Sequence, residues 1–389
     1  MTSLIRNTFV LLTLALTLTA CSTAEPPTGK PCDPYGGVIF VIGVSANQPL
    51  PDLTAEIGCR LEATIAASQP VGVISVDGAA HTLLPVRVYN VSANNPTLVQ
   101  DAIDGAYNEV VLTVQNARPQ ADGSDLALGL NFAADAAATA TDDVRSLVVI
   151  DSGLSDRGAG SMTPEGMTLA SPDEFAAHLH SQGTFTETTF SGLSIELRSI
   201  GYSAGAQPPL SERQRESVAR LWEGALTASG AEVEVVQFPR EGSAPKTSFT
   251  AGVVEVVPEV ELDPTAGAEY RFGDASALAF QPDLPTFKNK GAAEKELASL
   301  AEWLRAGSGR TATIVGHTSS ARLSVSAQLS ADRANTVKAT LVELGVPIAA
   351  LTARGDGYTA SPPDRDSRNV LIPGAAARNR VVVISLDQR

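Results

Sequence analysis

The chain has 389 residues, of which 43% are hydrophobic, and a formal net charge of −15. An apolar fraction of this size supplies real cores, and the length suits about two domains of roughly 150 residues each. The negative charge argues against nucleic acid and anionic membrane surfaces as partners, because both would repel the protein surface as a whole.

Residues 1–21 are predicted to be a signal peptide. Arg6 supplies positive charge, and residues 9–18 form an apolar run that is too short to span a bilayer. The sequence Leu18-Thr19-Ala20-Cys21 then resembles a bacterial lipobox, which implies that Cys21 becomes the lipid-bearing N-terminus. An ordinary secretory signal with a chance cysteine is the alternative. Both interpretations predict an exported protein, and the lipobox predicts one anchored to the cell membrane by lipid within the cell envelope.

Residues 22–36 are rich in proline and lack periodicity, which is typical of a tether. The two remaining cysteines, Cys32 and Cys59, are an even pair in an oxidising compartment, so we expect a disulfide between them. Two unpaired buried thiols are the alternative, because pairing requires the Cα atoms to lie within about 7 Å.

The first domain is predicted over residues 37–239, where short apolar runs alternate with segments of helical periodicity. The expected strands are 37–44, 71–76, 85–89, 109–115, 146–151, 192–201 and 233–238, and the expected helices are 53–68, 97–107, 126–138 and 211–229. Such alternation predicts an α/β fold, with a doubly wound, mainly parallel sheet covered by helices on both faces.

Residues 240–259 are rich in small residues and are predicted to be a linker to a second domain over residues 260–389. The expected strands here are 253–257, 269–272 or 278–280, 312–315, 351–354 and 381–386, with a helix over 291–305 and another from near Ser330 to Gly345. This mixture of strands and helices predicts an α+β domain.

Four separated motifs mark the second domain. They are Gly316-His317-Thr318, Leu329-Ser330-Ala331-Asp332-Arg333-Ala334, Gly355-Asp356-Gly357, and Asn379-Arg380, which we expect to open the last strand. With these motifs in this order, the chain from about residue 260 to 387 resembles the OmpA-like peptidoglycan-binding family.

The resemblance implies a binding site for the wall. In that family an aspartate after the Gly-His-Thr turn and an arginine in the following helix hold the diaminopimelate of the stem peptide. The carboxylate pairs with the ligand's ammonium, and the arginine forks onto its carboxylate. Arg333 matches the arginine, but Ser319 stands where the aspartate is expected. The resemblance therefore implies weak binding at Arg333, Ser319 and Thr318, with Asn379 and Arg380 as further candidate contacts.

Three of these candidates have an alternative role. Arg333 lies beside Asp332 in the predicted helix, so a solvated helix face would also explain it. Asn379 and Arg380 would equally suit the polar end of a strand.

Residues 37–239 are similar to a von Willebrand factor A domain, whose Asp-x-Ser-x-Ser motif, threonine and later aspartate bind Mg²⁺. Here the corresponding segments read Gly43-x-Ser45-x-Asn47, Asp122-Gly123-Ser124-Asp125-Leu126 and Asp151-Ser152-Gly153. A hard cation is usually held through one or two carboxylates, and Gly43 removes the leading one. We therefore expect a scaffold without a metal ion or other cofactor. A weak ion held by Asp151, Ser45 and Ser124 is the alternative.

The sequence favours a binding protein over an enzyme. It lacks the Gly-x-Ser-x-Gly, His-Glu-x-x-His and phosphate-loop motifs. We expect a lipid-anchored envelope protein whose second domain binds peptidoglycan and whose first domain presents a surface to an unknown protein partner. A wall hydrolase, or a structural protein with a decayed wall site, is the alternative.

Overall fold

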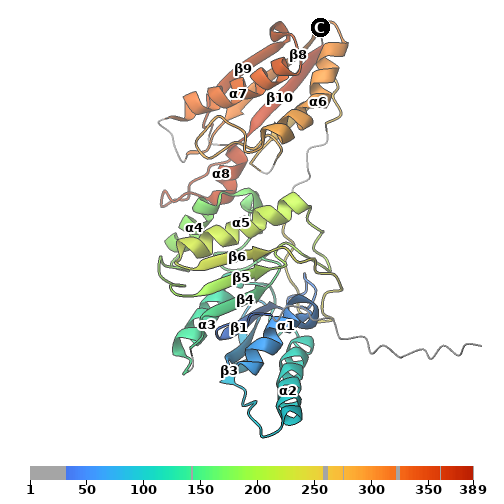
Figure 1. Ribbon diagram of the computed structural model, residues 1–389. Coiled ribbons are helices and arrows are strands. Elements are labelled where there is room, and N and C mark those ends of the chain that lie inside the picture. Colours follow the sequence, from blue (N-terminus) through green and yellow to red (C-terminus); the bar gives the residue numbers. More distant parts are fainter. Residues whose placement is uncertain are drawn as a thin grey trace, which may run out of the picture.

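The computed structural model describes residues 32–141, 143–256, 262–274, 276–320, 325–359 and 361–388. The signal sequence, Cys21 and most of the tether lie outside these ranges. The described chain contains two sheets, one in each predicted domain (Figure 1). The predicted mixture of α and β structure is thus confirmed.

The first sheet contains six strands in the order β3-β2-β1-β4-β5-β6. These are β1 (Val38–Gly43), β2 (Pro70–Val76), β3 (Ala80–Val88), β4 (Ser146–Ile150), β5 (Ser194–Arg198) and β6 (Glu232–Val236). All neighbours pair in parallel except β3, which runs antiparallel to β2. Every residue of β1 is buried, as expected for a central strand with both faces covered.

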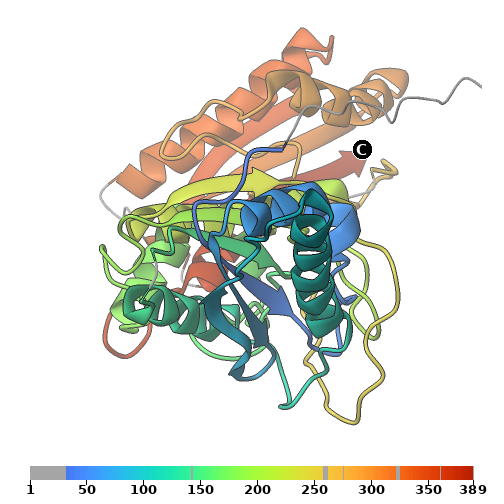
Figure 2. The same ribbon diagram turned by 60° about the horizontal axis from the view of Figure 1, so that its bottom comes forward.

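Helices cover both faces of this sheet. The helices α1 (Leu53–Ala66) and α2 (Pro96–Gln115) pack on one face, and α3 (Leu126–Thr139), α4 (Pro172–Ser181) and α5 (Glu212–Ala228) pack on the other. Figure 2 shows α1 in blue and α2 in teal across the strands from α3. A short 3₁₀ turn, η1 (Met167–Leu169), precedes α4.

The strand predicted over residues 109–115 is wrong, because this segment continues α2. Its valines favour a strand locally. However, Ile103, Ala106, Val110 and Val114 are all buried and lie three or four residues apart, so they form one helical stripe against the sheet. Tertiary packing along that stripe outweighs the local β preference.

The end of the tether is fixed to α1. Cys32 and Cys59 form a disulfide with their Cα atoms 5.8 Å apart. The backbone N–H of Tyr35 donates to Thr64 Oγ1 over 2.9 Å, and Arg60 Nη1 pairs with the nearly buried Glu196. The described end of the tether is therefore held against α1, and the chain then continues directly into β1.

The described part of the predicted linker packs against the first domain. Gln207 accepts from the backbone N–H of Val254 over 2.7 Å and donates to its carbonyl over 3.0 Å, and Val254 belongs to the core beneath α5. Residues 253–256 form no strand, contrary to the prediction, and the backbone N–H and carbonyl of Val254 bond to the Gln207 side chain instead of to a neighbouring strand. Residue 257 lies outside the described ranges.

The second sheet has the order β7-β10-β8-β9. Its strands are β7 (Glu269–Phe272), β8 (Arg310–His317), β9 (Leu351–Gly357) and β10 (Val382–Gln388). Only β8 and β9 pair in parallel. The helices α6 (Lys290–Ala306) and α7 (Ser326–Glu343) close one core over this sheet.

Helix α7 begins at Ser326 rather than near Ser330, and it lies unusually close to the sheet. A Cβ at Gly316 would lie 2.1 Å from the carbonyl oxygen of Ser330, and one at Gly355 would lie 2.2 Å from the backbone nitrogen of Ala331. The glycines of two sequence motifs thus permit the close approach of the helix that carries Arg333.

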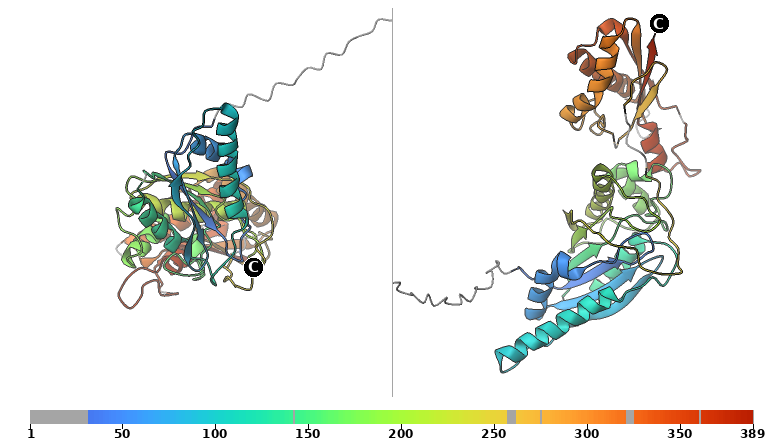
Figure 3. Two further views of the ribbon diagram at one scale, coloured as in Figure 1. Left: turned by 90° about the horizontal axis from the view of Figure 1, so that it is seen from below. Right: turned by 90° about the vertical axis from the view of Figure 1, so that its right-hand side faces the viewer.

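The short helix α8 (Pro373–Asn379) lies between the two domains, as the red helix in the right-hand view of Figure 3 shows. Its Gly374 meets backbone, since an added Cβ would lie 2.6 Å from the carbonyl oxygen of Glu165. Arg378 pairs with Glu165 across the same contact. The domains are therefore docked through α8, η1 and α4.

None of the helices within the described ranges has both the length and the apolar character needed to cross a membrane.

Candidate ligand pocket

Arg333 lies on α7 and is only 6% exposed. Its Nε donates to the carbonyl of Leu284 over 3.1 Å and its Nη2 to the carbonyl of Gln281 over 3.3 Å, while the guanidinium lies 5.1 Å from the Phe280 ring centre. Burial lowers the pKa of Arg333. No carboxylate within the described ranges forms an ion pair with it, so a buried cation is held in place by dipoles and a ring face.

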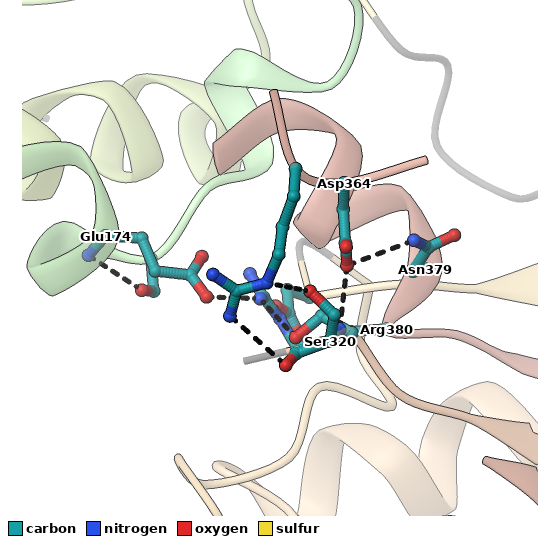
Figure 4. A network of polar contacts seen from close by, with 9 residues as sticks. Glu174, Ser320, Asp364, Asn379 and Arg380 are labelled. Atoms are coloured by element: carbon teal, nitrogen blue, oxygen red, sulfur yellow. Dashed lines mark hydrogen bonds and ion pairs between the residues drawn. The ribbon is translucent and has the colours of Figure 1, made fainter. Parts of the chain in front are cut away.

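Arg380 follows α8 and connects the domains. Its Nε donates to Asp274 over 2.6 Å, and its Nη1 donates to Glu174 of α4 over 2.7 Å. Figure 4 shows Glu174 reaching from the first domain toward Arg380. Burial alone would lower the pKa of Arg380, but Asp274 and Glu174 outweigh it and hold the pKa well above its usual value. This arginine is therefore neutralised by two carboxylates.

Thr318 and Ser319 follow β8 directly. The backbone N–H of Thr318 donates to the carbonyl of Gly357 over 3.0 Å, and Ser319 Oγ accepts from Arg380 Nη1 over 3.5 Å. Both side chains are 5% exposed. Ser319 therefore offers a neutral hydroxyl close to the Arg380 network.

Asn379 is the last residue of α8 and does not open β10, contrary to the prediction. Its Nδ2 donates to the carbonyl of Pro362 over 2.9 Å and to Asp364 over 3.2 Å. Asp364 also accepts from the backbone N–H of Ser320, as Figure 4 shows. This network fastens the segment before α8 to the end of β8, which gives Asn379 a positioning role in the structure.

Four of the five predicted wall-site residues line one cavity of about 230 Å³, and Asn379 does not. The lining residues are Ser171, Asp173, Glu174, Asp274, Phe280, Pro282, Asp283, Lys288, Thr318, Ser319, Ser326, Leu329, Arg333 and Arg380. The pocket is thus rich in charges of both signs, and one of its walls belongs to the first domain.

The contribution of the first domain to the pocket was not predicted from the sequence. Ser171 caps α4 by accepting from the backbone N–H of Glu174 over 3.2 Å, and a Ser-Pro-Asp-Glu start is a helix signal that could have been recognised. However, the contact between Glu174 and Arg380 joins residues 206 positions apart in the sequence, and no local pattern encodes such a contact.

The segments predicted to form a degenerate metal motif in the first domain are bridged by a side chain. Asp151 is fully buried after β4, and burial raises its pKa. Gln48 Nε2 donates to Asp151 Oδ2 over 3.0 Å and to Ser45 Oγ over 2.9 Å, while its Oε1 accepts from the backbone N–H of Ser152 over 2.7 Å. A Cβ at Gly43 would lie 2.0 Å from Asp151 Oδ2. The amide of Gln48 therefore fills the space beside the glycine.

Ser124 belongs to the same predicted motif but contributes differently. It is fully buried, and its backbone N–H donates to Asp156 over 2.6 Å. Asp125 caps α3 by accepting from Leu128. Nowhere in the described ranges do three histidine, cysteine or acidic side chains gather closely enough to hold a metal ion.

The comparisons with known proteins concern the second domain. Residues 279–370 match the OmpA family, a stretch that contains Ser319 and Arg333. No curated protein matches the chain at a significant level.

Several solved structures are similar to part of the chain. The periplasmic domain of Helicobacter pylori MotB is 18% identical over 33% of this chain and 79% of its own, with a TM-score of 0.27. A putative MotB-like protein from Desulfovibrio vulgaris is 25% identical over 31% of this chain and 75% of its own, with a TM-score of 0.25. The peptidoglycan-associated lipoprotein from Burkholderia pseudomallei is 21% identical over 27% and 85%, with a TM-score of 0.23.

Proposed function

We propose that this chain is a cell-envelope protein that binds peptidoglycan through the pocket at Arg333. The match of residues 279–370 to the OmpA family supports this function, because the resemblance to the peptidoglycan-binding members implies a wall ligand. The ligand would be the end group of a stem peptide, which carries an ammonium and a carboxylate.

The observation that supports this proposal most directly is the environment of the Arg333 guanidinium. A buried guanidinium without a carboxylate partner costs free energy unless its charge is compensated. The carbonyls of Leu284 and Gln281 occupy only part of its five donors. A ligand carboxylate in the adjoining cavity would complete this set.

Ser319 limits the strength of binding by the second domain alone. A hydroxyl offers an ammonium a single neutral acceptor, whereas hydrogen bonds to charged groups contribute about 1.5–3 kcal/mol. Within this proposal, Cys21 carries the lipid, and the first domain is a von Willebrand factor A-like module that presents a surface to another protein. The chain is a binding protein, not an enzyme.

Sedimentation with purified sacculi tests the proposed function. We expect the full chain to pellet with diaminopimelate-containing sacculi, and more weakly at high salt, because salt screens charges over a Debye length of about 8 Å at physiological ionic strength. Arg333→Ala should abolish pelleting. Lys338→Ala removes a charge from the same helix outside the pocket lining and should pellet like the wild type. Equal pelleting of all three proteins, or of none, would refute the pocket as the wall site.

A further inference from the structure

The lining of the pocket contains enclosed polar groups without a partner. In the part of the chain that the structure describes, neither Thr318 Oγ1 nor Arg380 Nη2 has a hydrogen-bond partner. Both residues line the cavity, and Thr318 is only 5% exposed. Buried polar groups in folded proteins are nearly always hydrogen-bonded. The lining therefore suits a polar occupant rather than an apolar one.

The cationic side of the pocket belongs to the second domain. Arg380 is already neutralised by Asp274 and Glu174, over 2.6 and 2.7 Å. Arg333 has no such partner within the described ranges. Lys288 also lines the cavity, but it offers a single ammonium, whereas Arg333 offers the fork geometry that suits a carboxylate. A ligand carboxylate would therefore be taken by Arg333.

Residues of the first domain form part of the acidic side of the pocket. Asp173 is exposed and lines the cavity, and its carboxylate makes no hydrogen bond or ion pair within the described ranges. Next to it, Glu174 uses Oε1 to accept from Arg380, while its Oε2 has no partner there. Acidic residues in the first turn stabilise a helix because they interact favourably with its dipole. That interaction alone does not explain why these side chains line a cavity shared with the second domain.

We propose that the pocket is a two-domain site for a zwitterionic amino-acid end group. Arg333 takes the carboxylate, and the acidic first turn of α4, Asp173 with Glu174, takes the ammonium. The first domain thus supplies the negative charge that Ser319 does not, and the site is complete only while the domains are docked. This inference rests on the proposed function, since it names the residues that recognise the second half of the same ligand.

Two small probes separate the halves of the site. Free meso-diaminopimelate carries both charged groups at each end, whereas pimelate has the same carbon chain and carboxylates without the ammonium groups. In calorimetric titrations of the full chain, Asp173→Asn should weaken diaminopimelate binding by about tenfold and leave pimelate binding unchanged, which is the size expected for one charged hydrogen bond. Glu174→Gln should act in the same direction. Arg333→Ala should abolish binding of both probes.

Matched variants control for the interface and for the other acidic wall. Glu165→Gln removes an exposed ion pair with Arg378 outside the pocket. Because exposed pairs contribute little, the domains should stay docked and neither affinity should change. Asp283→Asn removes an acidic group contributed by the second domain and should have the smaller effect. Adding Ser319→Asp to Asp173→Asn should restore diaminopimelate binding, because it returns a carboxylate to the pocket.

The outcomes separate this inference from the proposed function. If Asp173→Asn and Glu174→Gln leave the preference for diaminopimelate over pimelate unchanged while Arg333→Ala abolishes binding, the two-domain site is wrong and the wall function stands. If Asp283→Asn alone removes that preference, the carboxylate comes from the second domain, which also overturns the inference. If the wild type binds neither probe, both proposals fail.

Discussion

The side-chain amide of Gln48, together with the backbone N–H of Gly153, satisfies the buried carboxylate of Asp151 at the carboxyl edge of the first sheet. Asp151 follows β4 and Gly43 ends β1, so the two meet where the strand order reverses, which is where ligands bind in open α/β sheets. Gln48 donates to Asp151 and Ser45 and accepts from Ser152. It thereby crosslinks the loops after β1 and β4 with neutral groups.

Replacing Gln48 tests this role. Gln48→Ala would leave Asp151 without a side-chain donor and the buried backbone N–H of Ser152 without its acceptor, so we expect a loss of about 1–3 kcal/mol in the free energy of unfolding. Urea titration measures the loss. Gln115→Ala, on the exposed side of α2, is the matched control and should change little. Equal stability of the two variants would show that Gln48 is not a structural crosslink.

The candidate site was only partly predictable at the level of residues. Arg333, Ser319 and Thr318 were identified because family motifs lie at fixed positions around them. Asp173 and Glu174 could not be identified, since their part in the pocket depends on domain docking. Asn379 was placed at the start of a strand although Pro373 at the first helical position and the three alanines after Gly374 favour a helix locally.

At the scale of elements, strands and helices with strong periodicity were predicted well, and errors occurred where packing overrides local preference. The helix predicted over residues 211–229 matches α5, which begins with a capping box formed by Ser211 and Gln214. The valine-rich end of α2 was assigned to a strand, and α4 and α8 were not predicted. Both unpredicted helices are short, and both lie at the contact between the domains.

The docking of α8 depends on a glycine. A methyl group at Gly374 would meet backbone atoms of Glu165 and Met167 at 2.6 and 2.9 Å, and backbone cannot move aside as a flexible side chain can. We expect Gly374→Ala to loosen the domain contact, so that residues 165–169 and 373–379 exchange amide hydrogens faster. Gly291→Ala, where an added Cβ would lie 3.6 Å from the Asn289 side chain, should leave exchange at the contact unchanged. Unaltered exchange in Gly374→Ala would contradict tight docking.

The disulfide at the tether should stabilise the first domain. It closes a loop across a sequence separation of 27 residues, which corresponds to about 3.5 kcal/mol in the chain-entropy model. Chemical denaturation of the oxidised chain and of the Cys32→Ser, Cys59→Ser double variant measures this contribution. We expect a lower midpoint in the variant. Coincident unfolding curves would show that the bridge adds no stability.

At the scale of the whole molecule, the proposed attachments lie on different parts of the chain. The described chain begins beside α1, to which Cys32 is joined through Cys59, whereas α4 and α8 lie at the contact with the second domain (Figures 1 and 3). The pocket is lined by residues of α4 and of the second domain. If Cys21 carries a lipid, the first domain separates the membrane from the wall. A mechanical force between the membrane and the wall would then act across the domain contact that completes the pocket.

Competition on sacculi tests most directly whether the wall is held through this pocket. The full chain is first bound to diaminopimelate-containing sacculi, and free meso-diaminopimelate or pimelate is then added at increasing concentration and constant ionic strength. We predict that diaminopimelate releases the chain into the supernatant at concentrations where pimelate releases much less. Retention of the chain at saturating diaminopimelate would show that another surface holds the wall, and equal release by both probes would show that the ammonium is not recognised.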